Sequence, residues 1–201
     1  METNTVTEKK RLSTNERKLS ILKALTELLM TEKGAVTTKA LAAKLNISEG
    51  ALYRHFPSKA KIYDALLDYA QSYFQTNINA IFTSTPSGLL QIEQIALFLV
   101  QNIKTNPSIV MLLTGDALGQ EKERLKVRVN EIFNLFQSAF KQAMRNALAQ
   151  NQIPATYDGV TRANMLVALV LGHWIRFAKG NTTDLPVNIQ KQIRITIGLA
   201  S

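Results

Sequence analysis

The stretch of sequence that decides the fold is residues 37–57, which read TTKALAAKLNISEGALYRHFP. Apolar residues recur at helical spacing in two short segments, and a tight turn at Asn46 separates the segments. Thr37 or Thr38 can cap the first segment and Ser48 the second, because a hydroxyl oxygen accepts from the free N–H groups of a helix start. Asn46 tolerates the left-handed conformation that such a turn demands. The stretch therefore predicts a helix-turn-helix, whose second helix enters the major groove of DNA.

The rest of the chain also predicts helices, and no convincing strand or internal repeat. Ser13 or Thr14 is expected to cap the first helix, and Gly34 to end it. We expect an all-α fold of about nine helices, over residues 15–31, 38–45, 48–57, 59–82, 89–105, 107–114, 120–150, 159–179 and 186–199. The predicted organisation is a disordered basic arm (1–13), a helix-turn-helix domain (14–57) and a C-terminal dimerisation and regulatory domain (58–201).

The charge of the chain is uneven. The net charge is +9, and residues 1–63 hold 12 basic and 6 acidic side chains, against 12 and 9 in the remaining 138 residues. A basic excess in the first third favours a polyanionic partner for that segment, although a merely well-solvated basic surface is the alternative. The longest apolar stretch, residues 165–172, is far below the ~20 residues of a membrane-spanning helix, and there is no cysteine. We expect a cytoplasmic protein.

The sequence offers no catalytic constellation. Its two histidines, His55 and His173, lie on different predicted helices and have no metal-ligand neighbour at i+3 or i+4. There is no glycine-rich phosphate loop, and no nucleophile has a base nearby. The sequence therefore predicts a protein that is not an enzyme and that has no metal site and no cofactor.

The second helix of the predicted helix-turn-helix has a core side, which Leu52 and Phe56 fix, and an outward side. Arg54 is the only outward side chain that can reach a guanine bidentately. Small outward residues would let the helix backbone approach the groove floor. The remaining candidates are Gly50 and Ala51 on the outward side, and Tyr53 and His55 on the flanks, where they are better placed for phosphates.

Two lysines, Lys59 and Lys61, lie in the first turn of the next predicted helix, which Ser58 caps. A cation there opposes the helix dipole at a cost of ~0.3 to 1 kcal/mol, so local stability does not explain it. A DNA phosphate that lies across the helix start would explain a cation at this position. We expect this contact for Lys59 more than for Lys61.

The run SEGALYRHFPSK at 48–59, preceded by TTKALA at 37–42, resembles the DNA-binding signature of the TetR family of regulators. The resemblance covers about a quarter of the chain. It implies a three-helix reader domain, a fourth helix as the link, and a C-terminal domain that dimerises through its last two helices. The DNA-contacting residues would be Thr37, Thr38, Lys39, Ser48, Gly50, Ala51, Tyr53, Arg54, His55 and Lys59.

A narrower resemblance lies in the C-terminal half, in NP at 106–107, LTGDAL at 113–118, RL at 124–125 and RVN at 128–130. These runs are similar to those of the nucleoid-occlusion members of the family. The resemblance implies a DNA-binding dimer on palindromic chromosomal sites that also binds the division protein FtsZ and inhibits septum formation over the nucleoid. The groove for FtsZ would lie between the fourth and fifth helices, with Tyr69, Asn77, Phe98, Thr105 and Asn106 in its wall. Asn77 and Thr105 depart from the arginines expected opposite an acidic peptide tail.

The dimer interface is expected on the last two helices, because the helix over 159–179 is apolar almost all round and must be buried on every side. The predicted interface residues are Leu169, Leu171, His173, Trp174 and Ile193. The alternative function is a ligand-responsive repressor of the same fold, which needs a pocket of several hundred cubic ångströms inside the C-terminal domain. Bulky side chains on the helix over 120–150 favour a filled interior: Phe133, Phe136, Phe140, Met144 and Leu148.

Overall fold

Side-chain caps set where most helices begin. Ser13, Thr37, Ser48, Ser58, Ser87 and Asp158 each accept a hydrogen bond from a backbone N–H in the first turn. The computed structural model describes residues 13–32, 35–114, 116–180 and 185–198. Its helices are α1 (Thr14–Thr31), α2 (Thr38–Lys44), α3 (Glu49–Tyr53), α4 (Lys59–Ser84), α5 (Gly88–Thr105), α6 (Pro107–Thr114), the 3-10 helix η1 (Asp116–Glu121), α7 (Lys122–Ala149), α8 (Gly159–Ala178) and α9 (Ile189–Thr196).

The predicted helices agree with these bounds to within two or three residues except at the end of α3 and around α9. The third helix ends at Tyr53 and not at Pro57, and α9 begins at Ile189 because Asn188, in the left-handed conformation, precedes it. The predicted helix end at Gly34 and the expected arm over residues 1–12 lie outside the described residues.

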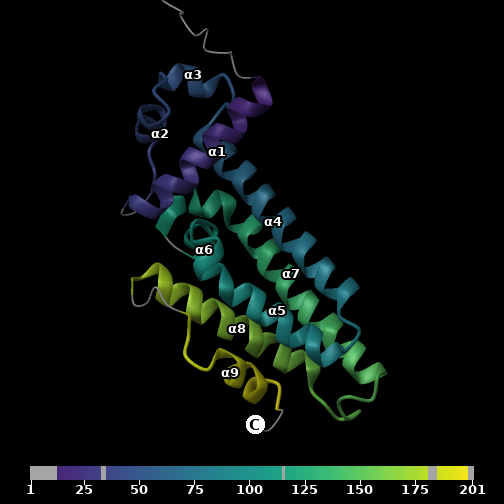
Figure 1. Ribbon diagram of the computed structural model, residues 1–201. Coiled ribbons are helices and arrows are strands. Elements are labelled where there is room, and N and C mark those ends of the chain that lie inside the picture. The colour runs from purple at the N-terminus through teal and green to yellow at the C-terminus, as the bar shows by residue number, and fades with distance from the viewer. Residues whose placement is uncertain (1–12, 33–34, 115, 181–184, 199–201) are drawn as a thin grey trace, which may run out of the picture.

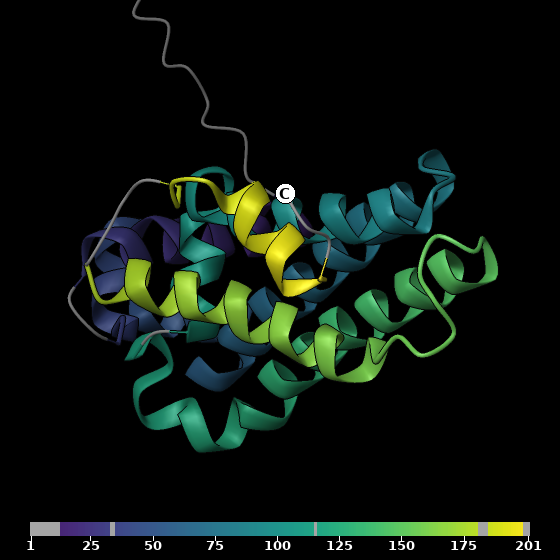
Figure 2. The same cartoon turned by 90° about the horizontal axis from the view of Figure 1, so that it is seen from below.

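The chain forms a small helical head on a longer helical bundle. In Figure 1, α1, α2 and α3 form the head, and α4 runs from it along the bundle beside α7. Helix α7 also packs against α5 and α8, while α6 lies between α1 and α8. Figure 2 shows α9 crossing the outer side of α8. This arrangement makes α4 the element that carries the head.

Aromatic side chains fill the middle of the bundle. The Phe74 ring contacts those of Phe136 and Trp174, with centroids 4.8 and 5.9 Å away. All three side chains are fully buried, and the indole Nε1 of Trp174 donates to the Leu99 carbonyl at 2.9 Å. Buried tryptophans need such a partner for their N–H group. The rings therefore hold α4, α5, α7 and α8 together.

No single helix of the described part of the chain is long and apolar enough to cross a membrane. Helices α5 and α6 reach that composition only as a pair, and they are bent by 102° where they meet.

Candidate nucleic-acid interface and partner surfaces

The turn between α2 and α3 has the geometry that its sequence predicts. Asn46 has a φ of 52°, and Ser48 caps α3 by accepting from the Ala51 N–H at 3.1 Å. Of the two threonines before α2, Thr37 is the cap, with its Oγ1 3.0 Å from the Ala40 nitrogen. Thr38 has a different role, because its hydroxyl donates to the Glu49 carboxylate at 2.7 Å. This bond joins the starts of α2 and α3.

One side of α3 is locked into the core of the head. Leu52 is fully buried and Phe56, just beyond the helix, is nearly so, in one cluster with Ile21 and Leu25 of α1 and Leu41 of α2. An ion pair of 2.9 Å between Lys44 and Glu27 also ties α2 to α1 and lowers the pKa of the Glu27 carboxyl. A rigid support of this kind is what a recognition helix requires.

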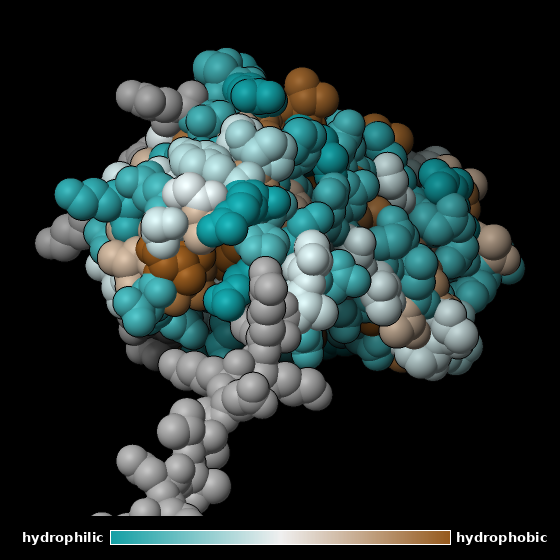
Figure 3. All heavy atoms as spheres, turned by 90° about the horizontal axis from the view of Figure 1, so that it is seen from above, coloured by the Kyte–Doolittle hydropathy of each residue, from teal (hydrophilic) through white to brown (hydrophobic). Residues whose placement is uncertain are grey.

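The opposite side of α3 is open. Gly50, Tyr53 and Arg54 are exposed, while Ala51 and His55 are half-buried. A Cβ at Gly50 would meet only the Ser48 Oγ, at 3.9 Å, so packing within the chain does not demand a glycine there. Gly50 therefore leaves the open side of α3 without a side chain at this position. In Figure 3, which looks onto the head, most of the visible surface around a smaller apolar cluster is hydrophilic.

The two lysines in the first turn of α4, Lys59 and Lys61, have different partners. Lys61 forms an ion pair with Asp64, with 3.0 Å between Nζ and Oδ2. Lys59 instead holds its ammonium group 5.7 Å from the centre of the Tyr63 ring. Burial raises the pKa of Tyr63 to about 12, so its phenol stays neutral under Lys59. Exposed Lys39, in the first turn of α2, adds a third cation to this end of the head.

Three residues at a spacing of four lie along α4: Tyr69, Tyr73 and Asn77. Tyr69 and Asn77 are predicted groove residues, and Tyr73 is not. Tyr69 is 53% exposed, and its ring stacks on that of Tyr73 with 6.5 Å between centroids. Asn77, one turn further, donates from its side chain to the Tyr73 carbonyl at 2.8 Å. Tyr73 is absent from the predicted groove residues, although its position four residues after Tyr69 places it on the same face.

Tyr73 also connects α4 to the end of α5. The Asn106 Nδ2 donates to the Tyr73 hydroxyl at 2.8 Å, and the Phe98 ring lies 5.8 Å from the Tyr73 ring. Burial raises the pKa of Tyr73. The exposed Thr105 donates to the carbonyl of Gln101 within its own helix. The structure thus brings Phe98, Thr105 and Asn106 to Tyr73, on which Tyr69 stacks, whereas the bond of Asn77 lies within α4.

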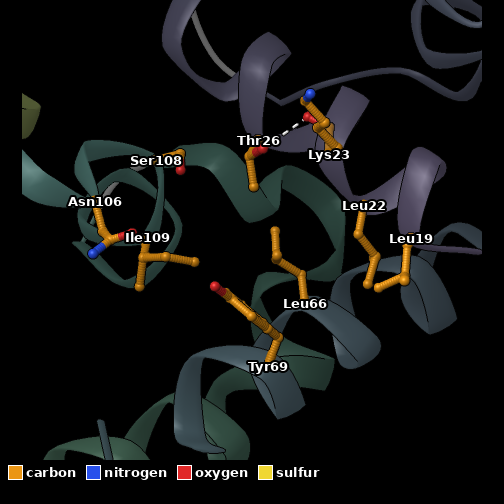
Figure 4. A pocket seen from close by; sticks show the side chains of 9 residues that line it. All are labelled: Leu19, Leu22, Lys23, Thr26, Leu66, Tyr69, Asn106, Ser108 and Ile109. Carbon is orange, nitrogen blue, oxygen red and sulfur yellow. Dashed lines mark hydrogen bonds between the residues drawn. The ribbon is translucent and has the colours of Figure 1, made fainter. Parts of the chain in front are cut away.

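Tyr69 and Asn106 also border a pocket of about 290 Å³ where α1, α4 and α6 meet. Figure 4 shows the Tyr69 hydroxyl pointing into this space, between the leucines of α1 and α4 and the Asn106–Ile109 end of α6. The described lining consists of Leu19, Leu22, Lys23, Thr26, Leu66, Tyr69, Asn106, Ser108 and Ile109. The pocket therefore lies between the head and the bundle.

The last two helices divide the predicted interface residues into two groups. His173, Trp174 and Ile193 face into their own protomer: His173 bonds Gln192 of α9 at 3.0 Å, and Trp174 and Ile193 are fully buried. They are core residues and do not belong to a dimer surface, which corrects the prediction. Leu169 and Leu171 are half-buried at the edges of an exposed stripe on α8, whose members are Met165, Ala168, Gly172 and Ile175.

Two separate parts of the chain match two family models. Residues 21–66 match the model described as bacterial regulatory proteins, tetR family. Residues 86–196 match an SlmA-like model described as the tetracyclin repressor-like, C-terminal domain.

Curated relatives cover most of the chain. The nucleoid occlusion factor SlmA of Marinomonas sp. (strain MWYL1) is 40% identical over 81% of this chain and 84% of its own length. The same factor of Idiomarina loihiensis is 36% identical over 85% and 87%. Among solved structures, a TetR transcription regulator from Haloarcula marismortui aligns with a TM-score of 0.77 at 15% identity, over 92% of this chain and 97% of its own. That structural likeness concerns the fold alone.

Proposed function

The chain belongs to the TetR family of bacterial regulators and, within it, to the nucleoid occlusion factors, and we propose that it binds palindromic DNA sites as a dimer at the nucleoid, in the cytoplasm. Such proteins are DNA-binding regulators and not enzymes. The proposed division of the chain gives DNA reading to residues 14–57 and dimerisation and partner binding to 58–201.

The observation that carries the DNA-binding part is the open side of α3. Leu52 and Phe56 are buried on one side of α3. The open side carries the exposed Arg54 and a glycine that packing within the chain does not require. We assign base reading to Arg54, because a guanidinium can bond guanine O6 and N7 together. Phosphate contacts, which position the protein without specifying sequence, are assigned to the surrounding polar and basic residues: Thr37, Thr38, Lys39, Ser48, Tyr53, His55 and Lys59.

The dimer is proposed to form through the stripe on α8. Met165 and Ile175 are 49% and 47% exposed, and they lie on one side of α8 together with Ala168 and Gly172. Between them, a Cβ at Gly172 would meet nothing within 4 Å, so a second helix could approach the backbone closely there. Two-fold pairing of this stripe would cover it with its own copy.

The proposed partner of the bundle is FtsZ, whose assembly the protein would inhibit. The α4–α5 seam offers exposed Tyr69 with Tyr73, Phe98 and Asn106, an aromatic surface with amide groups. Asn77 and Thr105 supply no cations here, so the contact would rest mainly on apolar packing and hydrogen bonds.

The alternative of a ligand-responsive repressor would require space inside the bundle. The rings of Phe74, Phe136 and Trp174 occupy its middle, and Phe140 and Met144 are buried with them. Of the other side chains expected to fill the interior, Phe133 is half-buried and Leu148 lies on the surface, 43% exposed. The filled middle favours the occlusion function.

The test is light scattering of FtsZ polymers from the same bacterium, with the protein and a duplex carrying its DNA site. We expect the wild-type protein to reduce the scattering of FtsZ polymers and the Tyr69→Glu variant to leave it unchanged. The DNA affinity of the variant should equal that of the wild-type protein. Scattering that the wild-type protein leaves unchanged would contradict the occlusion function.

A further inference from the structure

A guanidinium group of α7 contacts one polar side of α4. Lys61, Asp64, Asp68 and Gln71 recur at spacings of three and four residues, which places them on the same side of that helix. Arg128 of α7 faces this side: its Nη1 lies 3.5 Å from the Asp64 carboxylate, and its Nη2 donates to Asp68 and Gln71. Helices α4 and α7 are therefore joined by charge near the head as well as by aromatic packing further along the bundle.

The two oxygens of the Asp64 carboxylate have different cations. Oδ2 lies 3.0 Å from the Lys61 ammonium group, and Oδ1 lies 3.5 Å from the Arg128 guanidinium. Charge-assisted hydrogen bonds are typically about 2.7 to 2.9 Å long, so the contact with Arg128 is long enough to shorten. In the free protein the carboxylate is bonded mainly to the lysine.

The lysine of this pair is the more accessible partner. The side chain of Lys61 is 55% exposed, against 24% for Asp64 and 29% for Arg128. Lys61 also lies in the first turn of α4, next to Lys59, to which the proposed function gives a phosphate contact. An anion outside the protein can therefore reach Lys61, whereas Asp64 and Arg128 lie behind it between the two helices.

A DNA phosphate at this helix start would compete with Asp64 for the lysine, because both groups are anions. Once Lys61 turns to the phosphate, Asp64 loses its closer partner. A partly buried carboxylate without a cation is costly, and Arg128 is already beside it. Arg128 thus lowers the cost of releasing Lys61.

We propose that Asp64 masks Lys61 in the free protein and that Arg128 holds Asp64 when Lys61 passes to a DNA phosphate. The inference rests on the proposed DNA binding and adds to it two positioning residues, Asp64 and Arg128, which act through Lys61. Because such coupling is reciprocal, phosphate binding at Lys61 tightens the contact between α4 and α7, and a tighter contact favours DNA binding.

The experiment measures the affinity of the full-length protein for a duplex carrying its DNA site and for a random duplex, by fluorescence anisotropy at several salt concentrations. Asp64→Asn keeps the shape of the side chain and removes its charge. We expect this variant to bind both duplexes about 2- to 5-fold more tightly at low salt, with a slope of log affinity against log salt steeper by up to about one. Arg128→Gln should weaken binding about 2- to 5-fold, because Asp64 then holds Lys61 alone.

The deciding measurement repeats both substitutions in a Lys61→Gln background. There we expect Asp64→Asn and Arg128→Gln to leave the affinity and the salt slope unchanged, because the lysine through which they act is absent. A general effect of the altered charge on the field around the DNA would instead persist in this background.

The matched control for Arg128→Gln is Lys126→Gln, which removes a cation from the same helix. Lys126 is exposed, and the carboxylate that lies 3.9 Å from it, that of Glu123, is also on α7. This control should keep the wild-type affinity and salt slope. Thermal unfolding and analytical ultracentrifugation report whether each variant folds and dimerises. Arg128→Lys, which keeps the charge, is the second variant and should retain more DNA affinity than Arg128→Gln.

The outcomes separate the two proposals. If the wild-type protein binds neither duplex, the proposed DNA binding fails, and this inference fails with it. If the wild-type protein binds DNA but Asp64→Asn brings no gain in affinity, or brings the same gain in the Lys61→Gln background, the exchange of Lys61 between Asp64 and DNA is wrong and the proposed DNA binding stands.

Discussion

Helices α3 and α8 put their side chains to opposite uses. In the five residues of α3 only Leu52 is buried, and Glu49, Gly50 and Tyr53 are exposed. In the twenty residues of α8, five side chains are buried within the protomer, and Met165, Ala168 and Ile175 lie in one exposed stripe. A substitution in α3 should therefore change binding and spare the fold, whereas one in α8 should change the fold or the assembly.

The buried side of α8 should give the largest effect. Trp174→Ala removes a ring that three helices contact and leaves the Leu99 carbonyl without its indole donor. We expect the free energy of unfolding to fall by about 3 to 5 kcal/mol. Urea denaturation at one fixed protein concentration measures it, because the stability of a dimer depends on concentration. A loss below about 1 kcal/mol would show that Trp174 does not hold the core.

The exposed side of α8 should come next. Met165→Asp would bury an unpaired charge between two copies, which costs about 3 kcal/mol or more and weakens dimerisation roughly 100-fold or more. Analytical ultracentrifugation measures the dissociation constant. Leu148→Asp on α7 is the control, because Leu148 is similarly exposed and lies outside the stripe. If both variants remain dimeric, the stripe is not the interface.

On α3, Arg54→Ala should weaken binding to the specific palindrome by about 1 to 3 kcal/mol and hardly change nonspecific binding. Its side chain is exposed, so the thermal stability of the protein should stay as it is. Filter binding with specific and random duplexes measures the ratio of the two affinities. Equal losses on both duplexes would assign Arg54 to the phosphates.

The smallest effect is expected at the start of α4. Lys59→Ala should weaken specific and nonspecific binding about equally and lower the slope of log affinity against log salt by roughly one, since one phosphate contact is lost. Lys61→Ala should do less, because Asp64 already offsets that charge. A salt titration of both variants decides it, and the assignment is wrong if Lys61→Ala has the larger effect.

The head was predictable in detail because its signals are local. Hydroxyl caps, the left-handed Asn46 and the apolar spacing of residues 37–57 act over a few residues, and they set the helix starts and the turn. The sequence around the start of α2 does not show which of Thr37 and Thr38 is its cap, because both are hydroxyl residues. The bond from Thr38 to Glu49 spans eleven residues and depends on how α2 and α3 pack.

The α4–α5 seam was predictable in part. Tyr69 and Asn106 were expected to face one groove, and they do border the same pocket. Tyr73 was missed because its importance comes from a bond to Asn106, thirty-three residues away. The contribution of α1 to the pocket was missed for the same reason, since no spacing within α1 reveals that α4 and α6 lie against it.

By itself, the sequence determined the all-helical fold, the place of the helix-turn-helix and the helix starts, because these follow from contacts between near neighbours along the chain. Only the tertiary structure decided which sides of α8 and α9 are inside. The apolar residues of α8 run almost all round the helix, so periodicity could not tell Trp174, which packs on Phe74 and Phe136, from Met165, which faces outward. Burial of a side chain depends on which helices, distant in sequence, surround it. It is therefore set by the sequences of all of those helices and not by the periodicity of one.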